Sequence, residues 1–210
     1  MHYRARTAYR NGKIASSYDE ERFVSIRGRI EDSLEKRALL RTLSGVEVDG
    51  SLLEIPCGTG RITDFLGSRG FTLFGVDISI EMLQVARKKL QGVEGVSALL
   101  QGEAERLPFR DSAFEGVVCV RLFGHVPPHL RIAILREFAR VSRKFVVASY
   151  PMADSLRGMM RHLFPPSPMW FPINKRQIKH EAAHASLNVE KIKRVLGRYS
   201  ETAFVLFAKG

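Results

Sequence analysis

The sequence predicts an α/β fold: a doubly wound, mostly parallel sheet with a C-terminal antiparallel hairpin and a small helical cap. Three observations lead to this prediction. Short apolar strands alternate with helical segments over residues 51–150, which requires crossover connections and therefore a parallel sheet. A glycine-rich turn follows the first strand. The last two apolar segments, 187–196 and 199–208, have no helix between them and predict a hairpin.

Each predicted core strand is a short apolar run. The runs VVCV and FVVAS lack polar alternation, as expected of strands that are buried on both faces. The predicted strands are 51–55, 71–76, 96–101, 114–120 and 144–150. Helices are predicted from the glycine-rich turn to residue 69 and over 80–90, 130–141 and 174–186, and a loop follows the third strand through Pro108.

Two segments flank this core. Residues ~19–43 are predicted to form one amphipathic helix whose apolar stripe packs on the core. The stripe consists of Phe23, Ile26, Ile30, Leu34 and Ala38. Residues 151–172 carry five prolines, which favour an irregular cap. We therefore expect one domain over 1–210, with an N-terminal helical flank (1–45), a core (50–150), a cap insert (151–172) and a C-terminal helix and hairpin (173–210).

Composition favours a folded protein that is neither exported nor inserted into a membrane. Hydrophobic residues make up 45% of the 210, which is ordinary for a globular chain. No run of about 18 apolar residues occurs, and the basic N-terminus lacks the apolar core of a secretory signal. We expect a cytoplasmic protein. Cys57 and Cys119 lie in or beside predicted buried strands, so they are interpreted as core residues, with no disulfide and no metal site.

The chain is strongly basic, with a net charge of +11, and more than half of this excess lies in residues 151–210. Such an excess is compatible with nucleic acid, an anionic substrate or a membrane surface as partner. A basic protein whose charges are simply solvated is an equal alternative, because the lysines and arginines do not form one long run.

The turn over residues 54–60 is the first candidate for a ligand site. It follows the first strand, where a parallel sheet presents its backbone to ligands, and Gly58 and Gly60 allow close approach. Asp77 ends the second strand, where a carboxylate can accept hydrogen bonds from the two hydroxyls of a ribose. A plain tight turn is the alternative for the loop, and a helix cap, a role for which Ser79 competes, is the alternative for Asp77.

The loop does not fit a dinucleotide. A third glycine or alanine would be required at position 63, where the chain has Thr63. Glu54 would also repel a pyrophosphate, whereas it would attract the ammonium and sulfonium groups of S-adenosylmethionine (SAM), which carries no phosphate. The residues favour SAM over a dinucleotide.

Three motifs then resemble a known family: E-I-P-C-G-T-G, G-V-D-I-S and G-E-A-E-R-L-P-F, in that order. They resemble the class I SAM-dependent methyltransferases, which have a seven-stranded Rossmann-like fold. Within that class they are most similar to the branch that includes quinone-biosynthesis and other small-molecule enzymes. The resemblance covers residues ~50–150 and is specific for fold and cofactor, not for substrate.

The resemblance implies SAM as cofactor, S-adenosylhomocysteine (SAH) as product, and a role for each matching residue. Glu54, Gly58 and Gly60 would surround the methionine part, and Asp77 would hold the ribose. The family usually has Asp where this chain has Glu103, so Glu105 is an alternative for reading the adenine amine. The full set of candidate cofactor-binding residues is Tyr18, Glu54, Pro56, Cys57, Gly58, Thr59, Gly60, Asp77, Ile78, Met82, Glu103, Ala104, Glu105, Arg121 and Leu122.

Methyl transfer from a sulfonium is an in-line displacement, so the enzyme chiefly aligns the acceptor and excludes water. His125 is the candidate general base, with packing and pocket lining as the alternative role. The candidate substrate-binding residues lie in the cap: Arg161, His162, Trp170 and Phe171. A proline-rich cap with Trp170 as its core residue is an equal alternative.

Three functions follow from these residues. The first is methylation of a small molecule at O, N or C, favoured because the chain is short and has no added nucleic-acid domain. The second is RNA methylation, favoured by the net charge. The third is a SAM-binding regulator or subunit without catalysis. The sequence predicts no oligomeric state.

Overall fold

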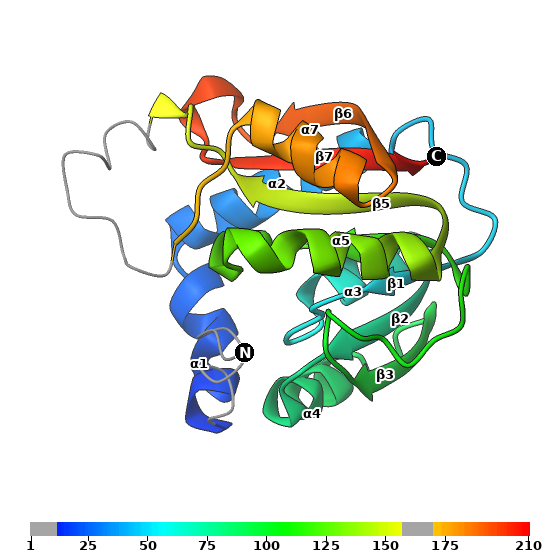
Figure 1. The fold of residues 1–210 in the computed structure, drawn as a ribbon. Helices are drawn as coiled ribbons and strands as arrows, with labels where there is room; N and C mark the ends of the chain where they lie inside the picture. Colours follow the sequence, from blue (N-terminus) through cyan, green and yellow to red (C-terminus); the bar gives the residue numbers. More distant parts are fainter. Residues whose placement is uncertain (1–11, 157–169) are drawn as a thin grey trace.

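The computed structural model describes residues 12–156 and 170–210 (Figure 1). Its centre is a seven-stranded sheet with the order β3-β2-β1-β4-β5-β7-β6. Strands β1 to β5 run parallel, while β7 pairs antiparallel with both β5 and β6. The mostly parallel sheet and the C-terminal antiparallel hairpin are therefore confirmed.

The strands lie close to their predicted positions, and the apolar runs of β1, β4 and β5 lie in the interior of the sheet. Every residue of β4 is buried, in agreement with its lack of polar alternation. Their bounds are β1 Ser51–Glu54, β2 Thr72–Asp77, β3 Val96–Gln101, β4 Phe114–Cys119, β5 Ser142–Pro151, β6 Leu187–Arg194 and β7 Thr202–Lys209.

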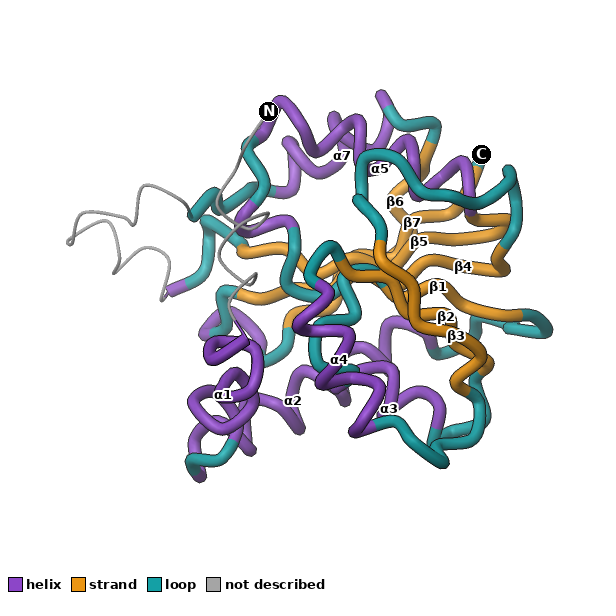
Figure 2. Tube along the Cα trace, turned by 90° about the horizontal axis from the view of Figure 1, so that it is seen from below, coloured by secondary structure: helices purple, strands orange, loops and turns teal. Residues whose placement is uncertain are grey.

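Helices cover both faces of the sheet (Figure 2). One face carries α5 (Pro128–Val141) and α7 (Lys175–His184), and the other carries α2 (Ile26–Leu43) and α3 (Arg61–Gly67). The helix α4 (Ile80–Lys89) follows β2, and α1 (Gly12–Phe23) lies beside both α2 and α4. Two apolar clusters result, one on each face of the sheet. No helix of the described residues combines the length and apolarity needed to cross a bilayer.

The prediction of one helix over residues 19–43 was wrong. The structure has two helices that are separated at Val24 and Ser25, and the Ser25 side chain caps α2 by accepting from the Gly28 N–H over 3.0 Å. A serine N-cap satisfies a backbone donor that the first turn of a helix leaves unpaired. The helical spacing of the apolar residues continues across this break, so the periodic pattern did not reveal it.

The predicted apolar stripe was also partly wrong. Ala38 is buried, but Ile26 is 81% exposed and Ile30 is 54% exposed. The face of α2 that packs on the sheet instead contains small and polar residues together with leucines: Gly28, Glu35, Ala38, Leu39, Thr42 and Leu43. The side of α2 with Glu35 packs on the sheet, and the side with the isoleucines faces away from it.

The two described ends of the predicted cap lie together. Met152 forms an isolated bridge with Ile173, and the Ile173 N–H donates to the Pro151 carbonyl over 2.8 Å. The segment therefore leaves and rejoins the fold at the carboxyl end of β5. Residues 157–169, which hold Arg161 and His162, lie outside the described residues.

Candidate functional site

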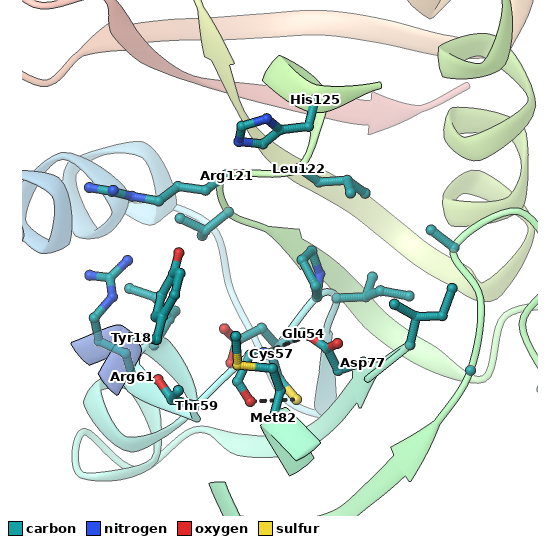
Figure 3. A pocket seen from close by; sticks show the side chains of 18 of the residues that line it. Tyr18, Glu54, Cys57, Thr59, Arg61, Asp77, Met82, Arg121, Leu122 and His125 are labelled. Atoms are coloured by element: carbon teal, nitrogen blue, oxygen red, sulfur yellow. Dashed lines mark hydrogen bonds between the residues drawn. The ribbon is translucent and has the colours of Figure 1, made fainter. Parts of the chain in front are cut away.

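A pocket opens at the carboxyl ends of β1, β2 and β4, where β1 lies between neighbours whose connections run in opposite directions. Ligands of open parallel sheets bind at such a switch point. Tyr18, Arg61 and Arg121 lie on one side of it, and Asp77 lies on the other (Figure 3). The lining residues are Tyr18, Arg22, Glu54, Ile55, Pro56, Cys57, Gly58, Thr59, Arg61, Ile62, Asp77, Ile78, Met82, Gly102, Ala104, Glu105, Val120, Arg121, Leu122 and His125.

The loop between β1 and α3 forms the floor of this pocket. Its Ile55–Pro56 peptide bond is cis, and the Cys57 N–H donates to the Val76 carbonyl over 2.9 Å. Gly60 has φ +78°, and a Cβ there would lie 2.7 Å from the Leu90 side chain. Gly60 therefore serves the close contact of the loop with α4 and is not among the lining residues.

Glu54 lies at the end of β1 and is only 1% exposed. Its Oε2 accepts a hydrogen bond from the Thr63 hydroxyl over 2.5 Å. Burial raises the pKa of Glu54 to about 8, since the ionised form is poorly solvated there. A cation placed against this carboxyl group would favour the ionised form.

Asp77 ties the floor of the pocket to α4. Its Oδ2 accepts from the Gly58 N–H over 2.8 Å, and its Oδ1 accepts from the Ser79 N–H over 2.9 Å. Burial raises the pKa of Asp77, against the effect of these backbone donors. Ser79 is the N-cap of α4, through a bond from the Met82 N–H. Asp77 is thus free of the capping role and faces the pocket.

Beyond Asp77, apolar side chains form a slot. Ile78, Met82 and Ala104, all candidate cofactor-binding residues, line this part of the pocket. Glu105 is in the lining, whereas Glu103 is exposed and is not. The structure therefore brings the alternative carboxylate to the pocket and leaves Glu103 outside it.

The helix α1 closes the pocket from the N-terminal side. Tyr18 and Arg22, one helical turn apart, both line the pocket. Asp19 fastens this helix to the floor, because its carboxylate accepts from the Thr59 hydroxyl over 2.7 Å and pairs with Lys89 over 2.9 Å. Tyr18, one of the candidate cofactor-binding residues, thus lies on a helix that is tied to the predicted cofactor loop.

A buried ion-pair cluster forms the wall beside Tyr18. Glu35, which is 2% exposed, pairs with Arg61 over 2.7 Å and with Arg121 Nε over 2.9 Å. Asp32 binds Arg61 and Lys36. Arg121 has φ +61°, an uncommon left-handed conformation that directs its side chain toward α2.

Sequence reasoning had missed Arg22, Arg61 and Glu35 in this region. Two signals were available. Arg61 directly follows the predicted loop, and Arg22 lies four residues after Tyr18 on one helix face. For Glu35 there was none, because an acidic residue in an amphipathic helix is normally placed in solvent.

His125 also lines the pocket, and its segment contacts the returning end of the cap segment. The His125 and Trp170 rings pack edge to face with centroids 5.2 Å apart. Gly124 permits this packing, since a Cβ there would lie 2.6 Å from the Trp170 ring. The Phe171 N–H donates to the Gly124 carbonyl over 2.9 Å. Arg131, 2% exposed, binds the carbonyls of Val126 and Phe171 and so fixes both segments.

The two cysteines are free and buried. Burial raises the pKa of the Cys57 and Cys119 thiols well above the usual value, so neither is a thiolate at neutral pH. Within the described ranges, 12–156 and 170–210, no group of three or more His, Cys, Asp or Glu side chains is arranged to hold a metal ion.

Residues 52–144, which include this pocket floor, match the family model described as "Methyltransferase domain". This core is a methyltransferase domain. The seven-stranded sheet of the chain and the motifs at its pocket agree with the SAM-dependent class that the sequence resembled. The predicted resemblance is therefore confirmed.

Two of the curated relatives are named as methyltransferases. A phosphatidylethanolamine N-methyltransferase of Cereibacter sphaeroides is 37% identical over 120 residues, which are 56% of this chain and 56% of the relative. A demethylmenaquinone methyltransferase of Tropheryma whipplei (strain Twist) is 30% identical over 109 residues, 51% of this chain and 43% of the relative. The chain spans about half the length of the curated relatives it matches.

Solved structures extend the likeness in fold to nearly the whole chain. Magnesium protoporphyrin IX methyltransferase from Synechocystis PCC 6803, with bound SAH, matches with a TM-score of 0.76 at 15% identity and covers 97% of this chain and 99% of that one. The CcbJ methyltransferase from Streptomyces caelestis matches with the same TM-score and identity and covers 98% and 99%. At such identities the likeness shows the methyltransferase fold.

Proposed function

We propose that this protein is a SAM-dependent methyltransferase that acts on a small organic acceptor. The observation that carries the proposal is the pair of buried carboxyl groups at the switch point of the sheet, Glu54 at the end of β1 and Asp77 at the end of β2. A cationic cofactor with a ribose requires this combination, whereas a pyrophosphate would be repelled by it.

The donor set fits SAM, which supplies a methyl group on a sulfonium. Glu54 would bind the ammonium of the methionine part, and Asp77 would accept hydrogen bonds from the ribose hydroxyls. Ile78 and Met82 would flank the adenine, and Glu105 would accept from its amine. Pro56, Cys57, Gly58 and Thr59 would form the floor, with Arg121 and Leu122 beneath the methyl group and Tyr18 as its cover.

His125 and Trp170 would form the acceptor side of the site. Both belong to segments that Arg131 holds through carbonyl groups, which supports a rigid wall suited to aligning an acceptor. His125 would act as general base only for an acceptor that must lose a proton early. Phe171 would continue this wall, and the roles of Arg161 and His162 stay predictions.

A small-molecule acceptor is supported by the relatives, whose names specify a phosphatidylethanolamine, a demethylmenaquinone and a magnesium protoporphyrin as substrates. The acceptor atom, O, N or C, is left to the experiment. A cytoplasmic location remains part of the proposal. RNA methylation, which the net charge of +11 favours, is the second candidate.

The test is conversion of SAM to SAH by the purified protein. The acceptors are phospholipids, demethylated quinones, phenols, amines and carboxylic acids, beside tRNA and rRNA fragments at several salt concentrations. We expect turnover with a small molecule, loss of turnover in Asp77→Ala, and RNA binding that salt abolishes. Methyl incorporation into RNA would overturn the acceptor class. SAM binding without turnover on any acceptor would support a regulator, and failure to bind SAM would refute the whole proposal.

A further inference from the structure

The side of α2 that faces away from the sheet is apolar. Ile26 is 81% exposed, Ile30 is 54% exposed, and Leu34 follows at the same spacing of four residues. Residues four apart lie above one another on a helix, so these side chains form one row about 12 Å long. Such a row on the open side of a helix is unusual, because α2 already buries its opposite side against the sheet.

This row continues onto a neighbouring element. Leu196, at the turn after β6, is 51% exposed and lines a groove together with Leu34, Arg37 and Arg41. Arg41 also donates to the Val195 carbonyl over 3.4 Å. We call the surface formed by Ile26, Ile30, Leu34 and Leu196, with Arg37 and Arg41, the α2 outer face.

The charged residues of the α2 outer face are all arginines. Positions 37 and 41 lie on the same side of the helix as positions 26, 30 and 34, and both side chains are exposed. Arg37 has no acidic partner among the residues that the structure describes.

The acids of α2 are paired elsewhere. Glu31 pairs with Arg27 over 3.1 Å, Asp32 pairs with Lys36 over 2.8 Å, and Glu35 is buried against Arg61 and Arg121. The outer face therefore presents apolar side chains and positive charge together, with its negative charges neutralised or buried.

We propose that the α2 outer face binds the surface of an anionic lipid bilayer. Exposed isoleucines and leucines beside arginines match both parts of such a surface, since the apolar side chains enter the boundary of the acyl chains while the guanidinium groups meet lipid phosphates. RNA fits this face less well, because branched aliphatic side chains offer no stacking to bases. A second copy of the chain would bring the same arginines together and repel itself.

The α2 outer face lies on the helix that also supports the pocket wall, so binding to a bilayer would affect where the pocket lies. The buried side of α2 carries Glu35, which holds Arg61 and Arg121 in the pocket wall. One helix thus has the bilayer contact on its outer side and part of the candidate active site on its inner side. Contact with the bilayer would therefore bring the pocket wall near membrane lipids.

The experiment is co-sedimentation of the purified 210-residue chain with vesicles, without cofactor. One set contains phosphatidylcholine alone and the other equal amounts of phosphatidylcholine and phosphatidylglycerol. We expect binding to the second set only, weakened by salt. The double variant Ile26→Ser/Ile30→Ser should lower the partition coefficient at least about tenfold. Arg37→Gln should lower it about fivefold.

Matched controls are Leu156→Ser, an exposed leucine elsewhere, and Arg110→Gln, an exposed arginine outside this face. Both should bind as the unchanged protein does, and circular dichroism should show that every variant is folded. Absence of binding to the anionic vesicles, or equal binding by the Ile26→Ser/Ile30→Ser variant, would overturn the proposal. So would a concentration-dependent dimer that this variant abolishes, or RNA binding that Arg37→Gln removes while vesicles remain unbound. None of these outcomes depends on methyl transfer.

Discussion

Replacement of Glu54 by Gln tests two consequences of burying this carboxyl group, the pH dependence of stability and the pH dependence of SAM binding. Its pKa is about 8 in the folded protein against 4.5 as the ordinary value. Between these values the unfolded chain is ionised while the folded protein holds a proton, so the stability of the ligand-free protein falls as pH rises and levels off above 8. Over pH 6 to 8 the loss is about 2 kcal/mol, at 1.36 kcal/mol for each pKa unit.

Glu54→Gln removes this slope, because an amide does not titrate. Its absolute stability also contains the burial of two new amide donors, a penalty of about 1–3 kcal/mol, so the slope is the better measure. Urea unfolding at several pH values between 6 and 8, on both proteins without ligand, gives the difference directly. Equal slopes in the two proteins would refute the assignment of the raised pKa to Glu54.

The affinity for SAM should rise with pH, whereas the stability of the ligand-free protein falls. If the ionised carboxylate binds the ammonium of SAM, apparent affinity rises with the ionised fraction of Glu54, about fiftyfold from pH 6 to 8 for a pKa of about 8. The amino group of SAM titrates in both measurements, so the ratio of wild-type to Glu54→Gln affinity isolates the side chain. Calorimetry should show this ratio rising with pH. A ratio that does not change would mean that Glu54 does not contact a cationic part of the ligand.

Three further predictions concern other parts of the pocket. Asp77→Ala should weaken SAM binding at least about tenfold and also destabilise the protein by about 2–4 kcal/mol, because two backbone donors lose a charged acceptor; calorimetry and urea unfolding measure both, and wild-type affinity would exclude a ribose contact. Glu105→Ala should weaken binding of SAH while Glu103→Ala leaves it unchanged, and the reverse order would restore the original assignment. Asp19→Asn should speed SAH dissociation several-fold in stopped flow by loosening α1 from Lys89, and an unchanged rate would show that α1 is not the barrier to release.

The core strands and the pocket floor could be predicted because topology determines them. Once strands and helices alternate, every loop that follows a strand must reach the same edge of the sheet. Glu54, Asp77 and Leu122 therefore come together although they are far apart in the chain. Motif positions within loops were sufficient for this, and no side-chain packing had to be foreseen.

The exceptions within those loops have a local cause. Glu103 and Glu105 differ by two positions in an irregular segment, where no periodicity indicates which side chain turns inward. Gly60 matched the motif, yet its hydrogen atom is needed against Leu90 and not against the pocket. A motif specifies that a residue type is required and leaves open which neighbour requires it.

The N-terminal helices could not be predicted, since a helical period does not say which of two apolar faces packs. The inner face of α2 packs on the sheet through small residues, leucines and one acid. Glu35 loses its solvation there but gains two guanidinium partners. Removing one partner of a buried pair is strongly destabilising, by about 3–5 kcal/mol, because the remaining charge stays buried. Arg61 and Arg121 belong to the core and Glu35 belongs to α2, so the core 50–150 contains the arginines but not the acid that neutralises them. The N-terminal helices are for this reason part of the pocket wall, and the isoleucines that the periodic pattern had assigned to the core are left on the outside.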